Sequence, residues 1–254
     1  HRDLHSFPTR RSSDLDILGK GATSIGFVLK CNTPVDADNL ASLLKDICPE
    51  AAEINFVTSC NNIVVTQAFS DYITSGHFDP DKVTSSALYD PLSEWMLKGV
   101  FPDGGENHSF ARLKSLIESA SKLPRHRVVG INGKLFGKCG ATAVQELAFS
   151  LAMGTEYLSF LTGSGIPADE AAQRIKFNLS VGNNYFMEIA KFRAGRLLWA
   201  HLVKAFGPEQ DSSCQMTVHA ETATYQMAIY DPFVNLLRTQ TEAMSAALGG
   251  VDSI

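Results

Sequence analysis

The segment 127–151 carries the patterns of a strand, a loop and a helix in that order, and it constrains the fold more than any other stretch. Val129 and Ile131 alternate with small or polar residues, which is the period of a strand with two unlike faces. Glycines follow, and from Ala141 onward apolar residues recur at helical spacing. This order is half of a β-α-β repeat and predicts a parallel α/β fold.

The same alternation of polar and apolar residues recurs in most of the other predicted strands. The polar or small members are Ser24 and Gly26 in 22–29, Asn55 in 53–58, Asn178 and Ser180 in 175–181, and Thr217, His219 and Glu221 in 215–221. An open parallel sheet covered by helices on both faces usually has continuously apolar strands. A closed (β/α)8 barrel of the TIM type explains the pattern, because its apolar strand faces meet the helices. We therefore expect a partly hollow, polar axis that can admit a long ligand, with Asn55, Asn132, Asn178 and Ser180 among its lining residues.

The predicted barrel is incomplete. Seven strands are predicted against the eight that closure requires. The strand that should precede Ala22 is missing, and Val251–Ile254 has the pattern of a truncated last strand. Residues 1–15 have no periodicity and resemble a translated sequencing adapter. We expect them to be a non-native, disordered segment and residues 16–254 to form the partial barrel.

Charge and composition exclude several classes of protein. The 22 basic and 27 acidic residues give no polyanion-binding pattern, so nucleic acid is not an expected partner. No apolar run reaches the roughly 18 residues that span a bilayer, so a membrane is not expected either. The five cysteines are odd in number and scattered, without a CxxC pair. This pattern predicts reduced thiols in a cytoplasmic protein, and no metal site.

Candidate site residues lie where predicted strands end, because barrel active sites gather at the C-terminal ends of the strands. These ends offer Tyr89, Asp90, Asn132, His219 and Glu221. His219 could act as a general acid or donate a hydrogen bond to a carbonyl. It could equally be a structural histidine bonded to Glu221 or to the backbone. No dinucleotide or phosphate-loop motif is present.

One charged residue falls on an apolar stripe of the predicted helix 185–206. Arg193 shares a helical face with Phe186, Ile189, Ala190, Leu197 and Ala200. Buried charges are rarely unpaired. We therefore expect Arg193 to be a structural partner of a carboxylate such as Glu146.

Three ordered segments resemble the methylmalonyl-CoA mutase family: GATAVQELAFSLAMGT at 140–155, NNYFMEIAKFRAGRLLWAHLVKAFG at 183–207, and YDPFVNLLRTQTEAMSAALGG at 230–250. The resemblance implies a substrate barrel that threads the pantetheine of an acyl-CoA along its axis. It also implies a separate domain that binds adenosylcobalamin. The hollow polar axis inferred above agrees with this.

Departures from the family's pattern bear on catalysis. Catalytic chains of the family carry a histidine where this chain has Leu135, a strand-end glutamine where it has Leu88, and a carboxylate-binding arginine where it has Lys98. Lysine keeps the charge but loses the bidentate fork. These replacements remove donors to the acyl carbonyl and carboxylate, and with them several kcal/mol of transition-state stabilisation. No catalytic position is intact, and the chain resembles the small, non-catalytic subunit of the heterodimeric enzymes.

Cofactor and partner follow from the resemblance. The family's cobalamin domain supplies an axial histidine from an Asp-x-His-x-x-Gly loop, which none of the seven histidines here occupies. We expect a partner or a missing domain to bind the adenosylcobalamin. The leading expectation is an auxiliary subunit supporting a catalytic large subunit that interconverts methylmalonyl-CoA and succinyl-CoA in propionate metabolism.

Two other functions compete with that of an auxiliary subunit. One is an active cobalamin-dependent acyl-CoA mutase whose altered acyl specificity is set by Leu88, Lys98 and Leu135. The other is an unrelated barrel of the lyase or aldolase type. That class needs a Schiff-base lysine or a metal cluster at the strand ends, and the sequence contains neither pattern.

Overall fold

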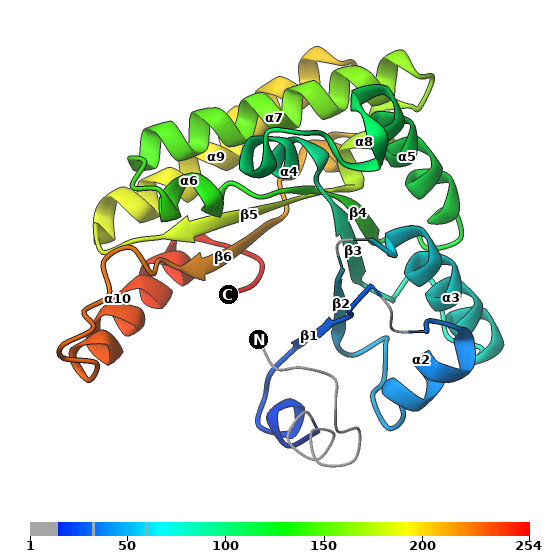
Figure 1. Cartoon of the computed structure of the whole chain (residues 1–254), viewed down its shortest axis with the longest axis horizontal. Helices are drawn as coiled ribbons and strands as arrows, with labels where there is room; N and C mark the ends of the chain where they lie inside the picture. Colours follow the sequence, from blue (N-terminus) through cyan, green and yellow to red (C-terminus); the bar gives the residue numbers. More distant parts are fainter. Residues whose placement is uncertain (1–14, 32–33, 59) are drawn as a thin grey trace. The chain divides into compact units, whose positions relative to one another are not determined.

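The computed structural model describes residues 15–31, 34–58 and 60–254, in which strands and helices alternate along most of the chain (Figure 1). The strands and helices are β1 (Ser24–Val28), α2 (Ala37–Leu43), β2 (Glu53–Val57), α3 (Asn62–Ser75), β3 (Ser85–Tyr89), α4 (Pro91–Lys98), α5 (Glu106–Ser119), β4 (His126–Ile131), α6 (Lys134–Lys138), α7 (Ala143–Gly163), α8 (Ala168–Gln173), β5 (Ile175–Val181), α9 (Tyr185–Ala205), β6 (Val218–Thr222) and α10 (Val234–Gly249). Short 3-10 turns occupy Pro102–Gly104 and Asp211–Cys214.

The hydrogen-bonded strand order follows the chain, β1-β2-β3-β4-β5-β6. The registers of β1 with β2, β2 with β3, β3 with β4 and β5 with β6 are all parallel. Six strands are therefore present in the described part of the chain, rather than the seven predicted. The predicted last strand is reduced to a single parallel bridge between His219 and Ser253. The parallel α/β class is confirmed, and a closed eight-stranded barrel is not.

The chain divides into two compact units. Unit 1 contains the residues up to Tyr89 together with Asn107–Val129, and unit 2 contains Asp90–Glu106 and Gly130–Ile254.

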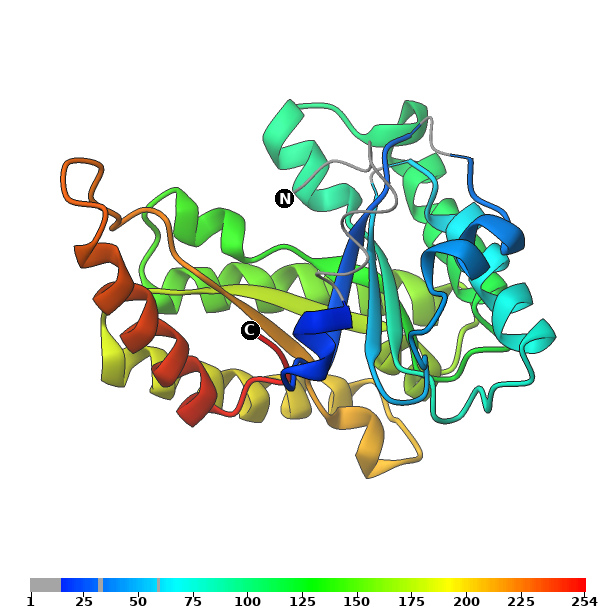
Figure 2. The same cartoon turned by 90° about the horizontal axis from the view of Figure 1, so that it is seen from below.

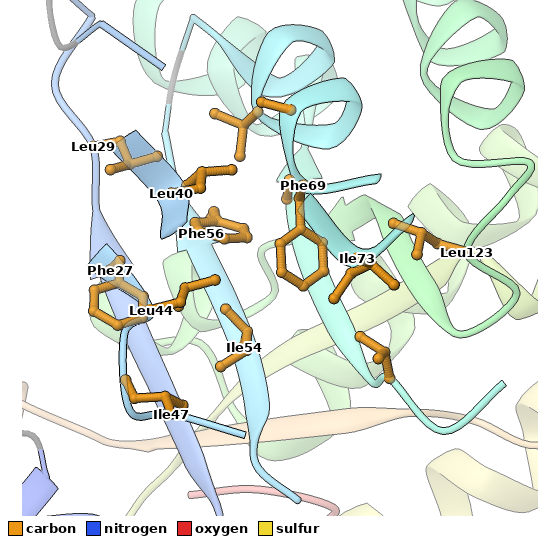
Figure 3. Close-up of a cluster of buried hydrophobic side chains, with 14 of the residues drawn as sticks. Phe27, Leu29, Leu40, Leu44, Ile47, Ile54, Phe56, Phe69, Ile73 and Leu123 are labelled. Atoms are coloured by element: carbon orange, nitrogen blue, oxygen red, sulfur yellow. The ribbon is translucent and has the colours of Figure 1, made fainter. Parts of the chain in front are cut away.

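The core of unit 1 lies between its strands and the helices α2 and α3 (Figure 3). Phe27, Ile54 and Phe56 point toward this layer, and Phe56 meets Phe69 edge to face at 5.3 Å between ring centroids. Burying each such side chain contributes about 1.5–3 kcal/mol. Leu15, which we expected to lie in a non-native segment, packs against this core. The rest of that predicted segment, residues 1–14, lies outside the described residues.

The polar members of the unit 1 strands meet on the opposite side. Asn55 Nδ2 donates to Ser24 Oγ at 2.9 Å, and Ser86 Oγ donates to Asn55 Oδ1 at 2.5 Å. Residues at alternate strand positions share a face, so this ladder lies on the side away from Ile54 and Phe56. The two unlike faces predicted for these strands are confirmed.

In unit 2, α7 and α9 pack together against β5. Phe177 on β5 contacts Trp199 on α9 edge to face, with ring centroids 4.8 Å apart. Gly154 on α7 permits this close packing, because a Cβ there would lie 2.8 Å from the Trp199 ring. A capping box formed by Thr142 and Gln145 starts α7. Helix α10, orange to red in Figure 2, packs against α9 and β6.

The prediction that every cysteine is reduced is wrong for Cys31 and Cys60, which form a disulfide with 5.6 Å between Cα atoms. Val28 and Val57 are partners in the register of β1 and β2, and each cysteine lies three residues further on. Parallel pairing thus brings together two residues separated by 29 positions, which spacing along the chain does not reveal. Cys48 and Cys139 are exposed thiols, and Cys214 is a buried one.

Helices long and apolar enough to cross a bilayer do not occur in the part of the chain that the structure describes.

Candidate functional site

Tyr89 and Leu88 end β3 in unit 1, and both are held by neighbouring polar groups. The Tyr89 ring is buried beneath the guanidinium of Arg112, which lies 4.9 Å from the ring centroid. Arg112 Nη2 also donates to the Cys60 carbonyl oxygen at 2.6 Å. Asn62 Nδ2 donates to the Leu88 carbonyl oxygen at 2.7 Å. These contacts hold the ends of β2 and β3 together.

Asp90 organises the polar contacts at the start of α4 in unit 2. Its Oδ1 accepts hydrogen bonds from Tyr157 Oη at 2.5 Å and from the Ser93 N–H at 3.1 Å. Its Oδ2 accepts the Asn132 N–H at 2.8 Å. Burial raises the pKa of Asp90, and hydrogen bonds from Ser93, Tyr157 and Asn132 offset part of that rise. The Asp90 carboxylate therefore holds Asn132, the residue at which the loop carrying Leu135 begins.

The loop after β4 forms the short helix α6, which the sequence did not predict. Leu135, at the position where the resemblance expects a histidine, lies on this helix. Lys134 Nζ lies 2.5 Å from Glu221 Oε2, and Lys138 Nζ lies 3.0 Å from Glu221 Oε1. Burial favours a higher pKa for Glu221, but the hydrogen bonds and charges of the two lysines outweigh it and lower that pKa. Glu221 therefore ties α6 to the end of β6.

The candidate strand residues of β5 and β6 are brought together by register. Asn178 is the partner of His219, and Ser180 is the partner of Glu221. His219 Nδ1 lies 2.9 Å from Ser253 Oγ, so its ring contacts the segment that follows α10. Lys98, in contrast, lies at the surface of α4 and pairs with Glu94 at 3.0 Å.

Ser180 lies in a buried ionic cluster that sequence reasoning missed. Lys191 Nζ is 2.8 Å from Glu146 Oε2 and 2.5 Å from Glu188 Oε2, and it donates to the Ser180 carbonyl oxygen at 2.7 Å. Glu146 in turn accepts the Ser180 N–H at 2.6 Å and its hydroxyl at 2.9 Å. Every backbone and side-chain polar group of Ser180 is thereby bonded. We call Glu146, Glu188 and Lys191 the buried triad.

The prediction that Arg193 pairs with Glu146 is wrong. Arg193 is exposed and donates to the Leu248 carbonyl oxygen at 3.3 Å, whereas Lys191 is the buried partner. The apolar stripe that suggested Arg193 faces outward, and the opposite face of α9 packs inward with Lys191 and Trp199. One available signal was the spacing of Glu188 and Lys191, which places them on one face at i and i+3.

A polar cavity of about 100 Å³ adjoins the buried triad at the ends of β5 and β6, lined in part by Glu146, Ser180, Glu188, Tyr225 and Gln226. Close by, α10 carries Glu242, whose two carboxylate oxygens are buried. Burial, and then the charge of Glu188, raise the pKa of Glu242 to about 7. The cavity is too small for an acyl-CoA but has room for a few water molecules.

No group of three or more His, Cys, Asp or Glu residues suited to a metal ion occurs within the described ranges. His126 is buried at the first residue of β4, although no predicted strand included it. Its Nε2 lies 3.2 Å from Thr66 Oγ1, and its Nδ1 lies 2.7 Å from Ser85 Oγ. Both ring nitrogens are hydrogen-bonded to hydroxyl groups, so His126 has no ring nitrogen available to hold a cobalamin.

Comparisons with known proteins match this chain to one family. The family model described as methylmalonyl-CoA mutase matches residues 6–254. The methylmalonyl-CoA mutase small subunit of Porphyromonas gingivalis is 42% identical over 245 residues, which are 94% of this chain and 38% of that protein. Methylmalonyl-CoA mutase of Rhizobium meliloti is 34% identical over 90% of this chain and 32% of its own length. The methylmalonyl-CoA mutase large subunit of Streptomyces virginiae is 36% identical over 69% of this chain and 24% of its own length. The chain thus spans less than two-fifths of these relatives.

Proposed function

Because the chain belongs to the methylmalonyl-CoA mutase family, we propose that it is part of the auxiliary small subunit of an adenosylcobalamin-dependent acyl-CoA mutase. In this role it supports a catalytic large subunit that interconverts methylmalonyl-CoA and succinyl-CoA. The parallel strands described above are then part of a (β/α)8 substrate barrel. The compartment proposed is the cytoplasm, and this part of the proposal now rests on three free thiols, since Cys31 and Cys60 form a disulfide.

The observation that carries the proposal is the chemistry of α6. An apolar Leu135 stands where the family resemblance expects an imidazole. The loop that bears it is fixed by Asp90 at its start and by Glu221 along its length. A leucine side chain can neither donate a hydrogen bond to an acyl carbonyl nor move a proton.

Two further replacements support the same role. Leu88 has no side-chain amide to offer, and Lys98 is turned to the surface in a pair with Glu94. The substrate-channel candidates Asn55, Tyr89, Asn132, Asn178, Ser180, His219 and Glu221 are proposed as structural remnants of a pantetheine channel. Several of them are already engaged by other residues of the chain, as Ser180 is by Glu146.

Adenosylcobalamin, when bound in such an enzyme, supplies the radical that starts the rearrangement. None of the seven histidines in the sequence lies in the Asp-x-His-x-x-Gly pattern that the family resemblance associates with cobalamin, so the proposal assigns the cofactor to the large subunit or to another segment. In this proposal the chain contributes a folded surface that binds the catalytic subunit.

Co-expression of the small subunit that carries this chain with the large subunit of the same organism tests the proposal. The expected result is a one-to-one complex with cobalamin-dependent mutase activity, and no turnover by the small subunit alone with the cofactor supplied. Turnover by the small subunit alone would instead favour the second function, an active mutase with altered acyl specificity. A large subunit that is fully active and never associates with this subunit would contradict the proposal.

A further inference from the structure

The outer faces of α7 and α9 in unit 2 form an apolar groove of about 310 Å³. Val144, Leu147 and Leu151 line one wall, and Met187, Ala194 and Leu198 line the other. Figure 1 shows the two helices running side by side in green and yellow. Val144 is 67% exposed and Leu198 is 45% exposed, so solvent reaches the groove.

The groove exposes no charged group, because its one charged lining residue, Lys191, belongs to the buried triad. Lys191 lines the groove with the carbon atoms of its side chain, yet its ammonium is directed inward to Glu146 and Glu188. The only part of Lys191 that meets the groove is therefore aliphatic. Because these ion pairs point inward, the outer surface of the groove between α7 and α9 is continuously apolar.

The apolar surface continues beyond the groove. Phe186 is 79% exposed and Leu197 is 61% exposed on the adjoining side of α9. With Val144, Met187 and Leu198, these exposed fractions amount to about 500 Å² of apolar side-chain surface, since a large side chain carries about 150–250 Å². A standard interface buries about 800 Å² on each partner, so this surface is large enough to form the greater part of one, and contiguous apolar surface of a few hundred Å² commonly marks an interaction site.

We propose that this surface, which we call the α7–α9 face, is where the catalytic large subunit docks. The inference rests on the proposed function and adds the location of the contact. Met187 and Leu198 are eleven residues apart, about 16 Å along the helix axis, which matches about three turns of a partner helix. Small residues such as Ala194 let that helix approach closely, ridge into groove.

A lipid surface fits this face less well. Membrane-binding helices place lysines and arginines around their apolar stripe. The helix α7 contains no lysine or arginine, and Arg193 is the one basic residue in the outward stripe of α9 between Phe186 and Leu197. Burial against another protein is therefore the favoured occupancy.

The experiment compares two glutamate substitutions that are matched in their local setting. Val144→Glu lies in the first turn of α7, and Val64→Glu, the control, lies in the first turn of α3 in unit 1. Both valines are exposed, at 67% and 48%, and a carboxylate is tolerated at both positions because helix N-termini favour negative charge. A third variant, Leu198→Glu, tests the opposite wall of the groove. Circular dichroism and melting curves verify that each variant is folded. Loss of folding in both groove variants, with Val64→Glu folded, would assign the face to another segment of the same subunit and contradict the inference.

The readout is the Kd for the large subunit, measured by calorimetry with the intact small subunit. Val144→Glu and Leu198→Glu are each expected to weaken binding at least about tenfold, as for buried interface positions, and Val64→Glu to change it less than about twofold. Unchanged affinity in both groove variants would overturn the docking site while leaving the proposed function intact. Absence of binding by the wild-type subunit would instead overturn the proposed function and the site with it. Loss of self-association alone, with large-subunit binding unaffected, would assign the face to a second copy of this chain and contradict the inference.

Discussion

Lys191 Nζ lies 2.8 Å from Glu146 Oε2, and both side chains are almost completely buried, at 1% and 2% exposure. This contact joins α9 to α7 and, through Ser180, to the end of β5. In this buried cluster the carboxylates of Glu146 and Glu188 share one ammonium, that of Lys191. Breaking such a pair is costly because it leaves an uncompensated buried charge.

Replacement of Lys191 by methionine is predicted to lower the free energy of unfolding by about 3–5 kcal/mol. The control is Lys98→Met, which removes a surface pair with Glu94 and is predicted to cost less than about 1 kcal/mol. Urea denaturation of both variants measures the difference. Equal losses in the two variants would show that the buried triad is no more important than a surface pair.

Glu242 is predicted to make stability depend on pH. Its folded pKa is about 7 against an ordinary value of 4.5, so between these values the folded chain holds a proton that the unfolded chain releases. The free energy of unfolding therefore falls as pH rises from about 4.5 to about 7 and levels off above that.

Glu242→Gln removes this titration, and its stability advantage over the wild type should grow across the same pH window. Melting temperatures measured from pH 4.5 to pH 8.5 provide the test, with the exposed Glu156→Gln as the control. A difference between Glu242→Gln and the wild type that does not vary with pH would refute the buried, protonated state of Glu242.

Tyr157→Phe is predicted to destabilise unit 2 by about 1.5–3 kcal/mol, because it deletes a hydrogen bond to a buried carboxylate. The Tyr157 hydroxyl donates to Asp90 at 2.5 Å and accepts the Leu92 N–H at 3.0 Å. Tyr185→Phe is a suitable control and should change stability by less than about 0.5 kcal/mol, as expected for a substitution away from such networks. Hydrogen exchange at the Asn132 amide should also accelerate in Tyr157→Phe, and protection equal to the wild type would argue against the role assigned to Asp90.

Cys31 and Cys60 are predicted to be joined in the purified protein under non-reducing conditions. Alkylation in denaturant, read by mass spectrometry, should modify three cysteines before reduction and five after it. The bond closes a separation of 29 residues, for which loop-closure entropy predicts about 3–4 kcal/mol of stabilisation. A Cys31→Ser, Cys60→Ser variant should lose that amount, whereas Cys48→Ser should lose almost none. Five cysteines alkylated without reduction would contradict the bond.

Local patterns predicted most of the elements, because period and capping are properties of neighbouring residues. Strand β5 begins and ends at the predicted residues. The alternation around Asn55 placed its polar face correctly. Helix α6 was missed because it has only five residues, one of them Gly137, which are too few to show a helical period.

What local patterns could not predict depends on contacts between distant residues. The disulfide of Cys31 follows from strand register, and the role of Lys191 follows from which face of α9 turns inward. Helix α9 is apolar on both faces, so hydrophobic spacing alone did not distinguish core from surface. For this reason Arg193 was predicted to be buried. Phe186 and Leu197, on the same face, are exposed and belong to the proposed docking surface.

The central claim is that this chain supports catalysis without performing it. The direct test replaces the catalytic histidine of the large subunit, in the loop corresponding to α6, by leucine and assays methylmalonyl-CoA turnover by the reconstituted, cobalamin-loaded heterodimer. The account predicts a complex that still assembles but has no measurable turnover, because Leu135 leaves the other barrel without an imidazole there as well. Residual turnover that disappears when the candidate residues Asn132 and His219 of this chain are replaced would contradict the account.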